Sequence, residues 1–186
     1  MKHKKNSLKC ETCSEKAIST KPSLCKSHFD TFILETTQKT IDEHKLFSKK
    51  DKICVGVSGG KDSLALVDVL TRLGYKVEGL FINEGIENYR EFSIEDMDTY
   101  SQKNNLFIRK VSFEKEAGFT LDAVMKTKKF HACTVCGTLR RKLLNKYAKE
   151  YDVIATGHNM DDEAQTILMN LARGNTSLFM RSGPKT

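Results

Sequence analysis

The sequence lacks the features that would mark a membrane-spanning or secreted protein. No apolar run approaches the roughly 20 residues that a bilayer requires. The N-terminus is rich in lysine but has no apolar segment behind it, so it does not resemble a signal peptide. Internal repeats and low-complexity tracts are also missing. Hydrophobic residues make up 39% and charged residues 30% of the chain. We therefore expect a globular, cytoplasmic protein without membrane association.

Acidic residues are missing from one long window. The chain carries a formal net charge of +7 at pH 7. Residues 123–149 contain no Asp or Glu but hold eight cations: Lys126, Lys128, Lys129, Arg140, Arg141, Lys142, Lys146 and Lys149. A run of charge is often only a solvated face. Eight cations beside a paired-cysteine motif favour a polyanionic partner instead.

A glycine-containing loop at residues 58–63 predicts a phosphate site. It follows an apolar strand-like run at 53–57 and precedes a helical pattern of leucines and valines. Two glycines allow backbone N–H groups to surround an anion, and the helix adds its positive N-terminal end. Lys61 supplies a charge, and Ser58 and Ser63 supply hydroxyl groups. The four-residue gap of the P-loop is missing, and an ordinary Gly-Ser turn is the alternative.

Four metal-ligand side chains lie close together near the N-terminus. They form the pairs Cys10-x-x-Cys13 and Cys25-x-x-His28. Two such pairs provide the four ligands of a closed, structural zinc site. The alternative is two chance pairs. A knuckle with so little apolar material needs its metal to hold its shape. The surrounding lysines suit contact with RNA phosphates, or simply keep the segment soluble.

A second cysteine pair, Cys133-x-x-Cys136, has several interpretations. It could be a dithiol redox pair, half of a zinc site or two ligands of an iron–sulfur cluster. Nearby cations lower thiol pKa values and favour thiolates. Cys54 lies in a predicted strand and fits a small core residue, and His131 is a weak candidate ligand. The residues alone leave these alternatives open.

Residues 157–165 form a polar loop and helix start after the last predicted strand. In a doubly wound sheet, the first and fourth strands end side by side, so this loop would face Lys61 across a crevice. Asp161 or Asp162 could bind Mg²⁺ or stabilise a substrate amide. The alternative is helix capping by Asn159 or Asp161. His158 could serve packing or function equally.

Strand and helix patterns alternate along the chain. Strands are predicted at 53–57, 76–82, 106–113 and 151–156, and helices at 29–47, 64–73, 88–104, 120–129, 139–147 and 161–173. This order predicts an α/β fold with a doubly wound parallel sheet. We expect a zinc knuckle at 1–28, a connecting helix at 29–50 and a main domain at 51–186. Because a further strand is expected, the main domain looks truncated.

Three motifs together resemble a known family. They are Ser58-Gly59-Gly60-Lys61-Asp62-Ser63, Cys133-Thr134-Val135-Cys136-Gly137 with Arg140-Arg141, and Gly157-His158-Asn159 through Gln165. The set resembles the PP-loop tRNA 2-thiolation enzymes, the group of TtuA, TtcA and the cytosolic tRNA thiouridylases. The N-terminal knuckle resembles the TtuA and cytosolic branch. The resemblance spans essentially the whole chain and implies a Rossmann-like PP-loop ATPase domain.

The resemblance implies that ATP adenylates the C2 oxygen of a tRNA uridine and that sulfur then displaces AMP. The implied ATP and Mg²⁺ site comprises Ser58, Gly59, Gly60, Lys61, Asp62, Ser63, Ile82, Gly157 and Asp162. The expected catalytic residues are Lys61, Asp62, Cys133, Cys136, Arg140 and Asp161. Arg140 occupies a place where relatives can have lysine, and it is expected to meet the tRNA or the activated intermediate.

Further cofactors and partners follow from the same resemblance. Zinc would bind the knuckle, and Cys133 and Cys136 would be two of three ligands to a [4Fe–4S] cluster. The sulfur donor would be a ubiquitin-like thiocarboxylate carrier or sulfide, and a homodimer is conceivable. The third cluster cysteine of the family lies beyond Thr186. We therefore expect this chain to hold a cluster poorly and to thiolate little by itself.

Two other functions compete with tRNA thiolation. Another PP-loop adenylating ligase, forming an amide or lysidine, would share the loop but leave the basic Cys-x-x-Cys pair without a role. A zinc-stabilised RNA-binding or assembly module without full catalytic activity would need neither ATP turnover nor sulfur. Substitutions of Lys61 and of the two cysteines separate these hypotheses.

Overall fold

The computed structural model describes residues 8–87, 91–127 and 132–174. The chain divides into two compact units, Met1–Leu46 and Phe47–Thr186. Across the described residues, no helix combines the length and the apolar character needed to cross a membrane. Lys128, Lys129 and His131 lie outside the described residues.

The N-terminal unit consists of the knuckle followed by helix α1, Lys26–Glu43. An antiparallel bridge joins Lys9 to Lys16 at the base of the knuckle. Its small core holds Cys10, Leu24 and Cys25. The predicted helix at 29–47 is displaced: α1 begins directly after Cys25 and ends where Lys45 adopts a φ of 47°. A left-handed residue cannot continue an α-helix, so the apolar spacing up to Phe47 overstated its length.

The second unit is built on a parallel four-stranded sheet in the order β3-β2-β1-β4. The strands are β1 Lys52–Val57, β2 Lys76–Asn83, β3 Ile108–Ser112 and β4 Val153–Thr156. This order confirms the predicted doubly wound sheet, with β1 and β4 paired. Strand β3 starts later than predicted because the Leu106 N–H donates to Ser101 O in the preceding turn.

Six helices accompany the sheet in the described part of this unit. They are α2 Lys61–Arg72, α3 Glu91–Lys103, α4 Phe113–Ala117, α5 Leu121–Lys126, α6 Ala132–Ala148 and α7 Met160–Ala172. The predicted Thr120 cap of α5 is confirmed, since its side chain accepts from the Ala123 N–H. Helix α4 was not predicted; it is a single turn between a Ser112 cap and left-handed Gly118. Helix α6 starts before the residue expected and includes Cys133 and Cys136.

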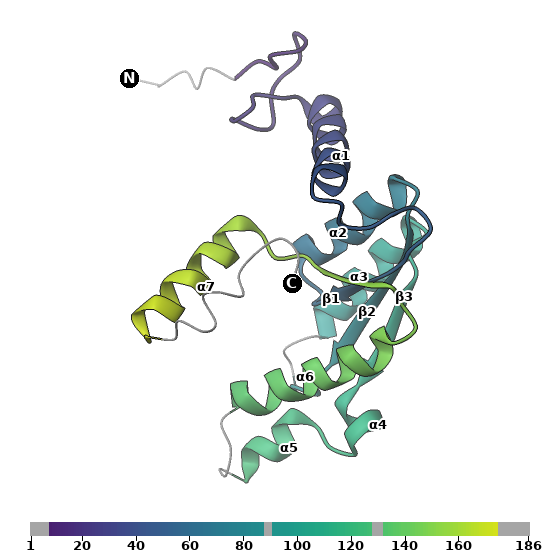
Figure 1. Ribbon diagram of the computed structural model, residues 1–186, viewed down its shortest axis with the longest axis vertical. Helices are drawn as coiled ribbons and strands as arrows, with labels where there is room; N and C mark the ends of the chain where they lie inside the picture. The colour runs from purple at the N-terminus through teal and green to yellow at the C-terminus, as the bar shows by residue number, and fades with distance from the viewer. Residues whose placement is uncertain (1–7, 88–90, 128–131, 175–186) are drawn as a thin grey trace. The chain divides into compact units, whose positions relative to one another are not determined.

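Alternating residues of the strands bury their side chains on opposite faces of the sheet. On one face, Cys54, Leu80 and Ile82 pack with Leu121 of α5 and Leu143 of α6. Helix α2 contacts β1 and β2, and its Val67 and Leu70 are buried. Figure 1 shows α6 crossing the sheet with α4 and α5 beside it. Packing on this face places α6 near the carboxyl end of β1.

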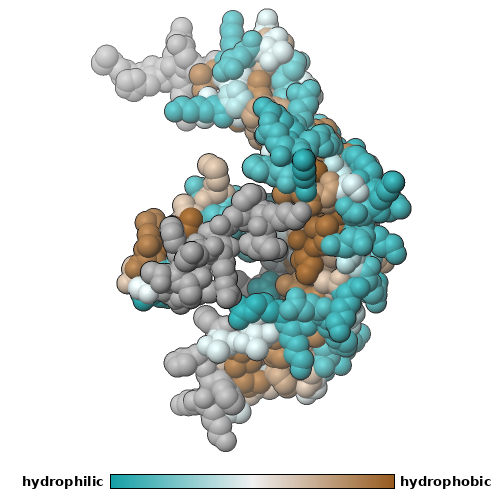
Figure 2. All heavy atoms as spheres, viewed as in Figure 1, coloured by the Kyte–Doolittle hydropathy of each residue, from teal (hydrophilic) through white to brown (hydrophobic). Residues whose placement is uncertain are grey.

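One edge of the sheet is less covered than the rest. Strand β4 exposes Ile154, and α7 has no buried residue in the described chain. Met160 is 87% and Leu168 65% exposed, and Figure 2 shows apolar surface over α7. The expected further strand falls on residues 175–186, which lie outside the described residues.

Candidate functional site

A cavity of about 470 Å³ opens at the carboxyl ends of three strands. Its walls come from the β1–α2 loop, the apolar end of β2, one side of α6 and the β4–α7 loop. The carboxyl edge of a doubly wound sheet, at the point where the strand order reverses, is where such folds bind ligands. Here that point lies between β1 and its neighbours β2 and β4.

The β1–α2 loop is held closed by its own hydroxyl groups. The Ser63 hydroxyl donates to Gly60 O (2.9 Å) and accepts from the Ser58 N–H (3.2 Å). Gly59 has a φ of 82°, a conformation that favours glycine. Gly60 caps α2 without any side-chain hydrogen bond to the first turn. The first N–H groups of α2 are therefore available to an anion.

Lys61 and Asp62 form an ion pair beside the loop. Lys61 Nζ lies 2.9 Å from Asp62 Oδ1, and their side chains are 88% and 52% exposed. Asp62 lines the cavity, but Lys61 and Gly59 do not. Ion pairs this exposed contribute little to stability. The Lys61 ammonium can therefore exchange its carboxylate partner for a phosphate at small cost.

Gly157 fixes how closely the β4–α7 loop approaches the phosphate loop. A Cβ atom on Gly157 would lie 2.8 Å from both the Cα and the N of Ser63. The crowding atoms belong to the backbone of α2, so they cannot move aside like the end of a side chain. Only glycine permits this approach. The predicted proximity of the first and fourth strand ends is thus confirmed at the level of backbone contact.

The residues after Gly157 cap helix α7 and also line the cavity. The Asn159 side chain accepts from the Asp162 N–H, and the Asp162 carboxylate accepts from the Asn159 N–H, both at 3.0 Å. This capping box confirms the Asn159 cap considered above. Asp162 also lines the cavity, whereas Asp161 is exposed and outside the lining. His158 lines the cavity too, with Nδ1 3.1 Å from Thr156 Oγ1.

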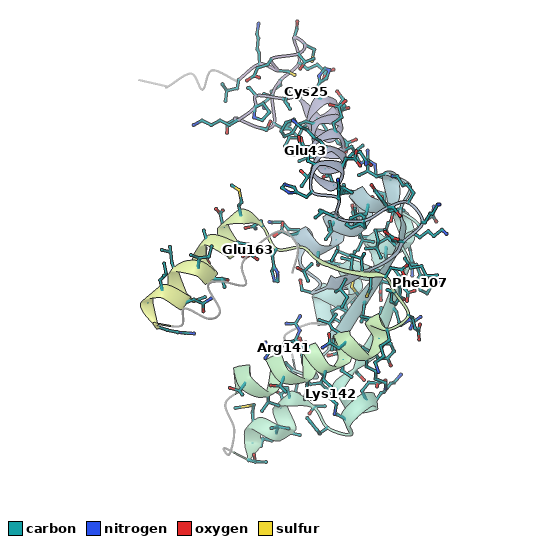
Figure 3. All side chains as sticks on the ribbon, viewed as in Figure 1. Cys25, Glu43, Phe107, Arg141, Lys142 and Glu163 are labelled. Carbon is teal, nitrogen blue, oxygen red and sulfur yellow. The ribbon has the colours of Figure 1, made fainter. Side chains whose placement is uncertain are left out.

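Helix α6 supplies the opposite wall through Gly137, Arg140, Arg141 and Leu144. Figure 3 shows Arg141 and Lys142 leaving α6 on different sides. The backbone of Cys133 lies in the first turn of α6, while its side chain is outside the described residues. Cys136 is half-buried and packs against the core cluster. The cavity therefore connects the phosphate loop to the α6 turn that follows the Cys-x-x-Cys pair.

Glu84 is a site residue that was not predicted from the sequence. Glu84 follows β2, and its side chain is only 1% exposed. Its Oε1 lies 3.3 Å from Nε of Arg140 on the cavity wall. The signal was available: a carboxylate at the carboxyl end of a buried strand in an α/β sheet. Ile82, a predicted site residue, and Leu80 add apolar lining from β2.

The four predicted zinc ligands converge. The sulfur and nitrogen ligand atoms of Cys10, Cys13, Cys25 and His28 all lie within 4.8 Å of one another. Cys25 Sγ is 3.2 Å from His28 Nδ1 and 3.7 Å from Cys13 Sγ. A tetrahedral site with bonds near ~2.3 Å separates its ligands by roughly this amount. The donor set and its spacing fit a closed zinc centre.

Electrostatics at the knuckle favour the thiolates of Cys10 and Cys25 but not that of Cys13. A hydrogen bond from the backbone of Glu15 lowers the pKa of Cys13, but burial and its hydrogen bonds to Cys25 and Cys10 raise this pKa to about 11. Burial pushes the pKa of Cys10 up, but hydrogen bonds from the backbone of Cys25 and Thr12 bring this pKa down to about 6. A hydrogen bond from Ser27 and another from the backbone of His28 lower the pKa of Cys25. The pKa of His28 is raised by its hydrogen bonds to Cys25 and Cys10. A cation in this pocket would replace the His28 proton as the partner of the thiolates.

The fit to an iron–sulfur cluster is incomplete. Of the six cysteines, three converge in the knuckle, Cys54 is buried in the core and two lie on α6. This chain therefore offers two thiols where the predicted cluster requires three.

Comparison with known proteins places the chain among nucleotide-binding domains. Residues 30–183 match the PP-loop domain family. The chain is 35% identical over 181 residues to a tRNA-5-methyluridine(54) 2-sulfurtransferase of Thermus thermophilus, covering 94% of this chain and 56% of the relative. It is 37% identical over 188 residues to cytoplasmic tRNA 2-thiolation protein 1 of Danio rerio, covering 94% and 55%.

A solved structure agrees with the sequence relatives. The U34-tRNA thiolase NcsA from Methanococcus maripaludis, solved with its [4Fe–4S] cluster, matches with a TM-score of 0.75 and 29% identity, over 91% of this chain and 59% of that chain. The chain thus spans between half and three fifths of the length of these relatives. The matched residues include the phosphate loop and every wall of the cavity, and the chain belongs to the PP-loop domain family.

Proposed function

We propose that this chain carries the ATP-binding and base-activating part of an ATP-dependent tRNA 2-thiolation sulfurtransferase. The observation that carries the proposal is the cavity that joins the Ser58–Ser63 loop to α6 one turn after the Cys-x-x-Cys pair. Its relatives named for tRNA 2-thiolation support the same function. A cytoplasmic location goes with this proposal.

ATP is proposed to bind with its phosphates at the start of α2. The N–H groups that begin α2 and the Ser58 hydroxyl favour the β and γ phosphates. The Ser63 hydroxyl, which donates to Gly60 O, keeps the loop in the shape that presents them. Leu80 and Ile82 offer apolar contact to the adenosine. Asp162 keeps oxygen lone pairs beyond its capping bond and is the proposed Mg²⁺ contact, with Asp161 next to it.

The proposed chemistry proceeds in two displacements. The uridine C2 oxygen attacks the α-phosphorus of ATP, pyrophosphate leaves, and the N3 proton is lost. Hydrosulfide, from sulfide or a thiocarboxylate carrier, then adds to C2. The C2–O bond breaks, AMP leaves with the oxygen, and the sulfur proton ends on N3. Arg140 and Arg141 line the cavity and are proposed to stabilise the negative charge that develops on the phosphate.

The proposal includes zinc and an iron–sulfur cluster, and the residues of this chain fit the zinc better than the cluster. Zinc bound by Cys10, Cys13, Cys25 and His28 would be structural, because all four positions are filled by protein. A [4Fe–4S] cluster would supply the sulfur-binding centre. Cys133 and Cys136 are the two thiols that this chain would contribute to it.

tRNA is the proposed partner. The described cations of α6, including the exposed Arg141 and Lys142, suit phosphate contacts along one helix. The rival ligase and the non-catalytic RNA-binding module remain distinguishable by what they require of Lys61 and of the α6 cysteines.

The test uses this chain with tRNA, Mg-ATP and sulfide under anaerobic conditions, following AMP and 2-thiouridine. Lys61→Ala should lower AMP formation about 100-fold, the usual cost of removing a charge that stabilises the transition state. Lys39→Ala, an exposed lysine on α1, is the matched control and should leave the rate unchanged. The chain alone should yield little 2-thiouridine.

The rival functions predict other results. For the proposed sulfurtransferase, replacement of both Cys133 and Cys136 by serine should preserve AMP formation and abolish the residual 2-thiouridine. An adenylating ligase would keep its full product turnover in that double variant. A pure RNA-binding module would show no tRNA-dependent AMP at all, and Lys61→Ala would leave its RNA affinity and salt dependence intact.

A further inference from the structure

Glu84 is a buried acid for which the proposed reaction has no role. Its side chain is 1% exposed, and it sits immediately after β2, behind the wall of the cavity. Burying a carboxylate is strongly unfavourable unless a cation and hydrogen bonds compensate. Arg140 is a cationic partner of this carboxylate, with its Nε 3.3 Å from Glu84 Oε1. The fold therefore places this buried carboxylate next to a cation of α6.

The backbone around Glu84 is held firmly. Glu84 O accepts a hydrogen bond from the Leu121 N–H at 2.8 Å. Gly85 has a φ of 71°, and a Cβ atom there would lie 2.7 Å from the Cβ of Thr120. The backbone that carries the carboxylate is thus fixed between the end of β2 and the start of α5. Arg140 gains a fixed partner on a rigid part of the fold.

The pair is suited to orientation rather than to added charge. A carboxylate beside a guanidinium reduces its net positive potential, so Glu84 does not strengthen the attraction for an anion at long range. The pair engages Nε, which leaves the two terminal nitrogens of Arg140 for other hydrogen bonds. Arg140 is 36% exposed and lines the cavity. A guanidinium fixed in this way can bind a phosphate through both terminal nitrogens.

Arg141 supplies the charge that the pair does not. It lines the same cavity, and within residues 8–87, 91–127 and 132–174 no ion pair involves it. One wall of α6 thus presents an oriented arginine next to an unpaired one. A helix that is only generally basic would not combine an arginine held by a buried carboxylate with an arginine that keeps its full charge.

We propose that Glu84 is a positioning residue that holds Arg140 so that its terminal nitrogens receive a phosphate group of the substrate. The inference rests on the proposed function, which places phosphate-bearing substrates in this cavity. The phosphate belongs either to ATP or to the tRNA backbone, and the two sources are tested separately. Glu84 itself is absent from the cavity lining and acts only through Arg140.

The experiment measures equilibrium binding of Mg-ATP and of tRNA to the full chain at one fixed salt concentration. The variants are Glu84→Gln, Arg140→Ala and the double variant. Arg140→Ala should weaken one of the two ligands about tenfold, the usual loss of a charge-assisted hydrogen bond. Glu84→Gln should weaken the same ligand about threefold or more. In the Arg140→Ala background, Glu84→Gln should have no further effect.

Glu150→Gln is the matched control. Glu150 also pairs with an arginine, Arg109, but is 65% exposed and lies away from the cavity. It should leave binding of both ligands unchanged. The ligand that responds identifies whether the phosphate belongs to the nucleotide or to the RNA.

Thermal unfolding gives a second readout that needs no ligand. Arg140→Ala leaves the buried Glu84 carboxylate without its arginine and should unfold at a lower temperature than the double variant. A double variant that unfolds at a lower temperature than Arg140→Ala would overturn the inference. So would wild-type binding by Glu84→Gln, or a loss of affinity from Glu84→Gln that is the same with and without Arg140. So would a Glu84→Gln chain that fails to fold while Arg140→Ala folds. Wild-type ATP binding by Lys61→Ala would instead contradict the proposed function.

Discussion

Single residues decide how closely the walls of the cavity approach one another. Gly157 allows the backbone of the β4–α7 loop to touch α2, and Gly59 turns the phosphate loop with a positive φ. Glu84 and Arg140 form a contact that the sequence could not reveal, because no local pattern joins a strand end to a helix so far along the chain. The phosphate loop itself was predictable, since its residues are consecutive.

Gly157→Ala should disturb both binding and stability. The added methyl would have to move the backbone of Ser63, which lies 2.8 Å from its position. Overpacking of this kind costs about 1–3 kcal/mol. We expect weaker ATP binding and a matching decrease in the free energy of unfolding by urea. Gly137→Ala is the control for stability, because its methyl would meet only the end of the Arg141 side chain, at 3.7 Å. Equal stability of the Gly157→Ala and wild-type chains would refute the tight approach.

Cys54 should resist alkylation. Its side chain is fully buried, and burial together with the nearby Glu78 carboxylate raises the pKa of its thiol from 9.0 to about 11. The folded state holds the thiol proton of Cys54 more tightly than the unfolded chain does. The contribution of this thiol to the free energy of unfolding is therefore complete below pH 9 and is lost as pH rises towards 11. Iodoacetamide at pH 8 with mass-spectrometric mapping should modify Cys54 only after unfolding. Rapid labelling of Cys54 in the native chain would show that the sheet face beneath α6 is open.

At the scale of elements, hydrophobic pattern and cap residues carried most of the information. All four strands and the helices α2, α5 and α7 lie close to their predicted ranges, because alternation, periodicity and the Thr120 cap are local signals. Helix α4 was missed because one turn is too short to show a period. The start of α6 was missed because its first two turns, residues 132–138, are poor in large apolar residues.

The knuckle is predicted to depend on metal and on pH. The lowered pKa of Cys10, about 6, keeps its thiolate formed at neutral pH. Cys13, whose pKa is raised to about 11, must lose its proton to bind zinc, so zinc affinity should fall as pH decreases across the neutral range. The fall should become steeper below about pH 6, where protons also compete for the Cys10 thiolate. Titration with a competing zinc indicator between pH 5 and pH 8 measures this. A pH-independent affinity would contradict thiolate ligation, and Cys13→Ser is the matched loss of one ligand.

Removal of zinc should act on the N-terminal unit by itself. A chelator should abolish the dispersed amide signals of residues 8–28, because little apolar material holds them otherwise. The signals of β1 and β2 should persist, since their core contains no predicted zinc ligand. Collapse of both sets of signals at the same chelator concentration would contradict this separation.

At the scale of the whole molecule, the sheet order and the cavity follow from a pattern that the sequence displays. Strand–helix alternation predicted the parallel sheet, and the sheet order then places the phosphate loop beside the β4–α7 loop. The alternation could not show that α6 forms the opposite wall, because that depends on tertiary packing of Leu143 against Cys54, Leu80 and Ile82 of the sheet. Nor could it show which side chains of α6 face the cavity.

The account depends on one crevice serving both the nucleotide and the RNA, and tRNA-dependent release of pyrophosphate tests this most directly. The assay uses the chain with Mg-ATP, with and without tRNA, for wild type, Lys61→Ala on the loop and Arg141→Ala on α6. We predict release that requires tRNA and falls at least tenfold in both variants, since each removes a proposed phosphate contact, Lys61 beside the loop or Arg141 on the wall of the cavity. Release that is independent of tRNA, or that persists at the wild-type rate in Lys61→Ala, would contradict the account.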